Sequence, residues 1–225
     1  MEFQGFSSKG LRFLREVRKR NSKPWFEENR SVYTDHLLAP FQQLVAVLSG
    51  TMLSIDPMFE VRPAINKTIS RIYRDTRFSN DKSLYRDTMW LTFKRPVKDW
   101  QDRPGFFFEL TPTTYRYGMG FYQARRSTMD AFRQTIDRNP RKFLRATSFY
   151  RTDNRFELHG EKYKRPLESD HPDTIQDWYQ RKSWYLACNR KIDDIVQSPD
   201  LVDELREGFV MLKSLYLFVP SGHQA

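Results

Sequence analysis

Two stretches of alternating residues, 105–110 and 115–122, constrain the fold of this chain most strongly. Each places apolar side chains on one face at a period of two residues, which is typical of β-strands. The alternating residues are Phe106, Phe108 and Leu110 in GFFFEL, and Tyr115, Tyr117, Met119 and Phe121 in YRYGMGFY. Only TPTT separates the two stretches. Because this is too short for a crossover helix, we expect an antiparallel hairpin.

Helical patterns flank the strands. Ser7 is suited to cap a first helix, Asn21 to end it, and Ser22 with Pro24 to begin a second. After Pro40 the apolar series restarts, and residues 172–192 also have a helical pattern that buries Leu186. The sequence therefore predicts an α+β fold, an antiparallel β-sheet flanked by N-terminal and C-terminal helices. We expect one domain over 1–225, with helices at about 7–54, the sheet at about 58–123 and helices at about 127–219.

Composition limits the class of protein. The chain has 225 residues, enough for one large domain with its own core, and 15% of them are aromatic. Its lone cysteine, Cys188, cannot form an internal disulfide, and no stretch resembles a secretory signal. Apolar runs such as LYLFV are far shorter than the about 20 residues of a membrane span. We expect a cytoplasmic protein with no membrane partner; the oligomeric state is not defined by the sequence.

Several kinds of site have no signature in this sequence. The histidines at 36, 159, 171 and 223 are far apart, and neither HExxH nor paired cysteines occur, so no metal site is expected. Gly118 and Gly120 form a bare GxG inside a strand pattern, which indicates close packing or a bulge more than phosphate binding. No cofactor is indicated.

One segment, residues 70–88 or SRIYRDTRFSNDKSLYRDT, is unusually rich in charge. We call it the motif segment. Arginine forks suit phosphate and carboxylate groups, and Lys82 adds a point charge. The candidate ligand-binding residues are Arg71, Arg74, Arg77, Lys82 and Tyr85, with Phe78 as a wall. Asp75 and Asp81 either hold the arginines in place or act as catalytic carboxylates, one of them as a general base.

The motif segment carries a resemblance to a known family. Its pattern RxxRDxRFxxDKxxY is similar to that of an uncharacterised family, domain of unknown function number twenty-four sixty-one. Trp25 with Phe26, the glycine pair before Tyr122, and His171 with Pro172 agree with it. The chain departs from the pattern at Leu84, where similar proteins commonly have proline, which affects the expected local geometry. The resemblance spans nearly the whole chain and implies no activity.

Three interpretations of the charges remain open. The motif segment could bind a phosphorylated or carboxylated small molecule in a pocket, or it could be a purely structural ion-pair network that joins the sheet to the N-terminal helices. In both cases we expect Asp75 and Asp81 to pair with nearby cations, and Tyr73 and Phe78 to need apolar cover near Trp25 and Phe26.

The third interpretation is a nucleic-acid-binding protein. The formal net charge of +10 favours anionic partners. Two predicted helices carry basic side chains that could follow a phosphate backbone. These are Arg12, Arg15, Lys19 and Lys23 in one region, and Arg133, Arg138, Arg141, Lys142 and Arg145 in the other.

Overall fold

A computed structural model describes residues 2–77 and 80–220. The chain forms two compact units, each assembled from separate parts of the sequence. The first comprises Met1–Phe93, Phe107–Tyr117 and Asn189–Glu207; the second comprises Lys94–Phe106, Gly118–Cys188 and Gly208–Ala225. The candidate motif segment lies entirely in the first unit.

The first two N-terminal helices of the first unit begin where the sequence indicates, whereas the break at Asn29 and the π-helix were not expected. The N-terminal helices are α1 (Ser8–Lys19), α2 (Lys23–Glu28), α3 (Arg30–Tyr33), the π-helix η1 (Thr34–Leu38) and α4 (Ala39–Ile55). Ser7 caps α1, its Oγ accepting the Gly10 N–H at 3.3 Å, and Ser22 precedes α2 with Pro24 in the first turn.

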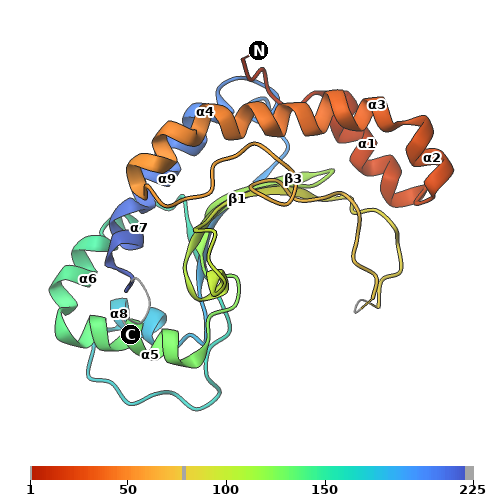
Figure 1. The fold of residues 1–225 in the computed structure, drawn as a ribbon. Coiled ribbons are helices and arrows are strands. Elements are labelled where there is room, and N and C mark those ends of the chain that lie inside the picture. The colour runs from red at the N-terminus through yellow and green to blue at the C-terminus, as the bar shows by residue number, and fades with distance from the viewer. Residues whose placement is uncertain (1, 78–79, 221–225) are drawn as a thin grey trace. The chain divides into compact units, whose positions relative to one another are not determined.

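Pro40 explains the π-helix that separates α3 from α4. Proline has no N–H to donate, and its ring clashes with the carbonyl four residues earlier, here that of His36. The chain accommodates this by widening one turn, so that α3, η1 and α4 follow one another without a break (Figure 1). The widened turn lies beside α1, where a Cβ on Gly10 would be 2.3 Å from the His36 carbonyl oxygen.

The sheet is antiparallel and has five strands in the order β1-β2-β3-β5-β4, which confirms the α+β class. The strands are β1 (Met89–Phe93), β2 (Gly105–Leu110), β3 (Thr114–Gly120), β4 (Glu157–His159) and β5 (Tyr185–Lys191). The apolar faces expected for residues 105–110 and 115–122 are buried in β2 and β3, where Phe106 and Tyr117 are fully buried. β1 alternates in the same way, and its Met89 is fully buried. The hairpin of β2 and β3 is confirmed.

The remaining helices follow β3. They are α5 (Arg126–Arg138), α6 (Pro140–Ala146), α7 (Phe149–Thr152), α8 (Asp173–Tyr179) and α9 (Leu201–Phe218), and a short 3-10 helix η2 (Trp100–Asp102) precedes β2. The prediction of one helix over 172–192 holds only for α8 and is wrong for the residues after it. The C-terminal region 127–219, expected to be helical, also contains the strands β4 and β5. Residues 185–191 instead form β5, which pairs with β3 and β4. Sheet partners distant in the sequence outweighed the local helical pattern.

Gly118 and Gly120 serve close packing, as the sequence suggested. A Cβ on Gly118 would be 1.8 Å from the Leu186 carbonyl oxygen, and one on Gly120 would be 2.3 Å from the Tyr185 Cα. Both contacts are with the backbone of β5. The glycine pair therefore lets the two strands approach, and its role is structural.

Aromatic clusters form the core of each unit. In the first unit Phe6 packs on Phe41 and Phe108, with ring centroids 4.8 and 5.7 Å apart. In the second unit Trp184 packs on Phe132 and Trp178 at 5.5 and 5.3 Å. All six rings are at most 1% exposed, so each unit has a dry core.

One helix, residues 30–55, is long and apolar enough by length and composition to cross a membrane, with a mean hydropathy of 1.4. The core helix of a soluble protein meets the same criteria. Here Phe41, Leu44 and Leu48 of this helix are fully buried.

The prediction of a single domain over 1–225 remains to be tested. Because β2, β3 and β5 each contribute residues to both units, we expect one cooperative thermal transition. Far-UV circular dichroism and tryptophan fluorescence should give the same midpoint, since each unit contains tryptophans. Two separate midpoints would show that the units unfold independently.

Candidate functional site

The motif segment is a hairpin-like excursion that starts from the edge of the sheet, next to β1. Ser70 donates its backbone N–H to the Trp90 carbonyl at 2.9 Å and accepts the Trp90 N–H on its Oγ at 3.0 Å. Further along, Tyr73 and Tyr85 form an antiparallel bridge. Figure 1 shows the segment, in yellow, extending from the sheet as a long loop. Both of its ends are therefore held by backbone hydrogen bonds.

Asn21 fastens this hairpin to the end of α1. Its Oδ1 accepts the backbone N–H groups of Leu84 and Tyr85 at 2.6 and 3.0 Å. Its Nδ2 donates to the carbonyl oxygens of Val17 and Tyr85 at 3.0 and 2.9 Å. One side chain thus satisfies both backbone groups of Tyr85. The sequence indicated Asn21 only as a helix terminator, because its hairpin partners Leu84 and Tyr85 lie more than sixty residues away.

Aromatic stacking completes the anchorage. Tyr85 lies parallel to Phe26, with centroids 4.3 Å apart and an interplanar angle of 9°. Tyr73 contacts both rings, at 5.0 Å from Tyr85 and 5.7 Å from Phe26. Tyr73 contacts Phe26 as expected but remains 44% exposed, whereas Phe78 lies outside the described residues. Burial, with the neighbouring Tyr73, raises the pKa of Tyr85 to about 12.

Both aspartates of the motif segment pair with its arginines, as expected. Asp75 receives two hydrogen bonds from the guanidinium of Arg77, at 3.0 and 2.8 Å, and one from its backbone N–H at 3.2 Å, and lies 3.6 Å from Arg71. Asp81 lies 3.1 Å from Arg74. Lys82 extends its Nζ to the carbonyl oxygen of Thr76 at 2.8 Å. The contacts form two sets of ion pairs, Arg71–Asp75–Arg77 and Arg74–Asp81, with Lys82 held by the backbone. We call these six residues together the charged group.

The electrostatics of this group suit holding an anion better than proton transfer. Hydrogen bonds from Arg77 hold the pKa of Asp75 below its usual range, and the Ser83 backbone N–H, together with its side chain and Arg74, lowers that of Asp81. A general base works best with a pKa near the operating pH, so two carboxylates whose pKa values are lowered are weak bases. Four cationic side chains against two carboxylates leave a surplus of positive charge.

The structure separates Tyr85 from the other candidate residues. Tyr85 is 2% exposed and belongs to the core, whereas the Arg77 side chain is 75% exposed. Arg74 is intermediate, with 25% of its side chain exposed. Tyr85 therefore positions the hairpin, and the charged side chains form its outer surface.

The second basic region contains one residue that does not lie on the surface. Arg133 is 4% exposed and donates to the backbone carbonyls of Tyr179 and Arg181 at 2.8 and 2.7 Å. Asp130 balances its charge at 2.8 Å. The sequence-based expectation that Arg133 belongs to a solvated basic face is wrong, because its guanidinium satisfies carbonyl groups next to β5. Arg138, Arg141, Lys142 and Arg145 are exposed.

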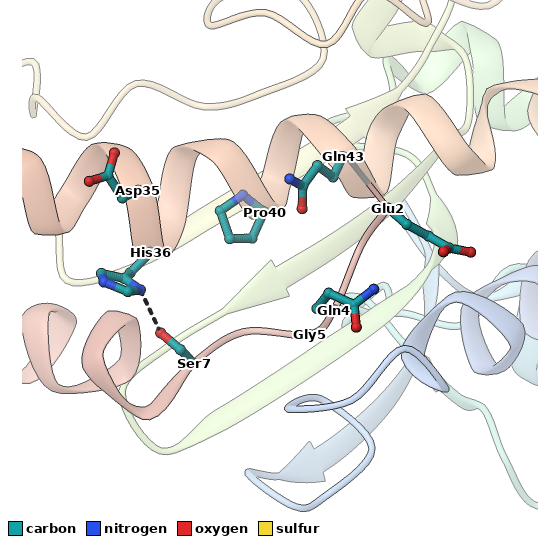
Figure 2. A pocket seen from close by; sticks show the side chains of 8 residues that line it. All are labelled: Glu2, Gln4, Gly5, Ser7, Asp35, His36, Pro40 and Gln43. Atoms are coloured by element: carbon teal, nitrogen blue, oxygen red, sulfur yellow. Dashed lines mark hydrogen bonds between the residues drawn. The ribbon is translucent and has the colours of Figure 1, made fainter.

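A cavity of about 440 Å³ lies elsewhere in the first unit, between the N-terminal segment and the helix of residues 30–55 (Figure 2). It is lined by Glu2, Gln4, Gly5, Ser7, Asp35, His36, Pro40 and Gln43. Ser7 Oγ lies 3.1 Å from His36 Nδ1. The π-turn places His36 at this position, and no sequence pattern indicated the cavity. None of the motif residues lines it.

The fold and the candidate site together define a class of protein: a basic α+β protein whose exposed hairpin carries arginine, aspartate and lysine side chains. The chain belongs to the family of conserved hypothetical proteins DUF2461, which it matches over residues 9–218. This confirms the resemblance noted in the sequence, and the family has no assigned function. Comparison with curated proteins finds no relative.

Proposed function

We propose that the motif segment binds a small molecule through a phosphate or carboxylate group. The observation that carries this proposal is the arrangement of its charges. Asp75 orients Arg77 through a two-point contact, and Asp81 orients Arg74, so the guanidinium forks are ordered before any ligand arrives. Preordered cations lose less conformational entropy on binding, and arginine forks match the geometry of phosphate oxygens.

The catalytic role suggested for Asp75 and Asp81 is a weaker part of the proposal, because both are weak bases at neutral pH. We propose binding without committing to a reaction or a cofactor. A cytoplasmic setting also remains a proposal, and the buried free thiol of Cys188 is compatible with it.

Thermal denaturation tests the proposal. At about ten times its Kd, a ligand adds about 1.4 kcal/mol to the stability. We expect a Tm rise of about 3–6 °C for a chain of this size. Inorganic phosphate and citrate should raise the Tm above that in sodium chloride of the same ionic strength. Arg77→Ala should remove this specific rise.

The chain offers a matched control. Arg62 and Glu60 form the same kind of pair as Arg77 and Asp75. In both pairs the arginine lies two residues after the carboxylate and donates to it from its backbone N–H and from its guanidinium. Arg62→Ala should therefore keep the response to phosphate and citrate. If Arg77→Ala keeps it as well, the ligand is not held by the motif. If that variant only lowers the Tm in every salt, the ion pairs are structural.

A second candidate function, nucleic-acid binding, is favoured by one observation on α1. Lys9, Arg12 and Arg15 are exposed, and among residues 2–77 and 80–220 no carboxylate oxygen lies within 4.0 Å of their charged groups. If α1 contacts a phosphate backbone, the affinity for nucleic acid should fall steeply as the salt concentration rises. This salt dependence should be weaker in an Arg12→Ala, Arg15→Ala variant. Unchanged salt dependence in that variant would contradict a role for α1.

A further inference from the structure

A separate feature of the second unit is the exposed ring of Tyr122, immediately after β3. Its side chain is 74% exposed, the largest exposure among the large apolar side chains in the described part of the chain. The preceding residue, Phe121, is 3% exposed and packs edge-on against Trp184, with centroids 5.3 Å apart. The backbone is therefore anchored in the core where it presents Tyr122 to solvent.

Trp100 lies against this ring, and Lys94 lies against Trp100. The Trp100 centroid is 5.4 Å from that of Tyr122, at an interplanar angle of 42°. Lys94 places its Nζ 3.1 Å from the centroid of Trp100, and burial lowers its pKa. Because the ammonium group occupies a face of Trp100, the ring open to a ligand is that of Tyr122.

The loop that carries Trp100 is held in place. Asp102 Oδ1 accepts the backbone N–H of Arg125 at 2.7 Å and the hydroxyl of Thr128 at 3.0 Å. The Arg125 guanidinium pairs with Asp99 at 2.9 Å and with Asp102 at 3.0 Å. The two aromatic rings thus form a preordered platform and are not the tip of a loose loop.

The two segments that carry the platform are rich in basic residues. Residues 94–103 and 122–126 contain six basic side chains and two carboxylates, and both carboxylates pair with Arg125. The basic residues are Lys94, Arg95, Lys98, Arg103, Arg125 and Arg126. A flat exposed ring carried by segments rich in basic residues fits a ligand that combines a π-face with negative charge.

From this geometry we infer that Tyr122 is a stacking site for an unpaired base of single-stranded nucleic acid, with the basic residues of these segments attracting its phosphates. A base in a duplex has both faces covered by its neighbours, so an exposed tyrosine selects the single strand. The site is distinct from the motif segment and from the basic face of α1. It does not depend on the function proposed for either.

Fluorescence anisotropy with a fluorescein-labelled oligothymidylate tests the inference. Tyr122→Ala should weaken binding by at least about fivefold, since stacking contributes about 1–3 kcal/mol per base. Tyr122→Phe should bind as the native protein does, because it keeps the ring. The Tm of both variants should be unchanged, since the ring lies outside the core.

Two further probes separate stacking from attraction to the backbone. An abasic strand of the same length has phosphates but no bases. Its affinity for the native protein should be no higher than the affinity of Tyr122→Ala for the oligothymidylate. An Arg12→Ala, Arg15→Ala variant should keep the preference for the strand with bases. The inference is overturned if the native protein does not bind the oligothymidylate, if Tyr122→Ala binds it normally, or if the abasic strand binds equally well.

Discussion

Gly118→Ala should destabilise the protein by about 3 kcal/mol, at the upper end of the usual cost of overpacking, because the obstructing atoms belong to the backbone. The added Cβ would lie 1.8 Å from the carbonyl oxygen of Leu186, well inside contact distance. Neither atom is at the end of a flexible side chain, so relief requires β3 and β5 to separate. Separation would break backbone hydrogen bonds in the middle of the sheet. We expect the midpoint of urea unfolding to fall sharply, or the protein to accumulate in insoluble form.

Gly50→Ala is the matched control for this experiment. Gly50 lies in α4, is exposed, and has no atom within 4 Å of the position of an added Cβ. Alanine is preferred to glycine within a helix by about 0.5–1 kcal/mol, so this variant should be slightly more stable than the native protein. Equal unfolding midpoints for Gly118→Ala and the native protein would contradict the close approach of the two strands.

Asn21→Ala should destabilise the protein by about 2–3 kcal/mol and release the motif segment. The substitution removes both donors and the acceptor that hold Leu84, Tyr85 and Val17. The backbone groups of Leu84 and Tyr85 then lose their hydrogen-bond partners. Water can replace these partners only if the hairpin opens. Limited trypsin digestion should cut the variant rapidly after Arg74 or Arg77, while the native protein resists.

Asn29→Ala controls for the loss of an asparagine at a helix end. Its Nδ2 donates to the Trp25 carbonyl at 2.8 Å, within the same helical region. This variant should digest as slowly as the native protein. An Asn21→Ala variant that resists trypsin equally well would mean that Asn21 does not hold the hairpin. Rapid cleavage of the native protein at Arg77 would instead show a mobile loop and argue against a preordered anion site.

Much of the candidate site could be foreseen because its contacts are local. Asp75 and Arg77 are two residues apart, and Arg74 and Asp81 are seven apart, so their alternation in the sequence suggested their pairing. The sequence did not reveal that Tyr85 is buried. The hydroxyl donor expected at the ligand is a core residue, because Phe26 covers its ring.

The sequence by itself determined the elements whose signal lies within one short stretch: the first helices and the hairpin of β2 and β3. Periodicity and turn chemistry act over a few residues, so they can be read without the fold. Only the tertiary structure decided that residues 185–191 form a strand, that Arg133 is buried and that Asn21 holds Tyr85. Each of these depends on partners tens of residues away, which supply hydrogen bonds and burial that outweigh local preference.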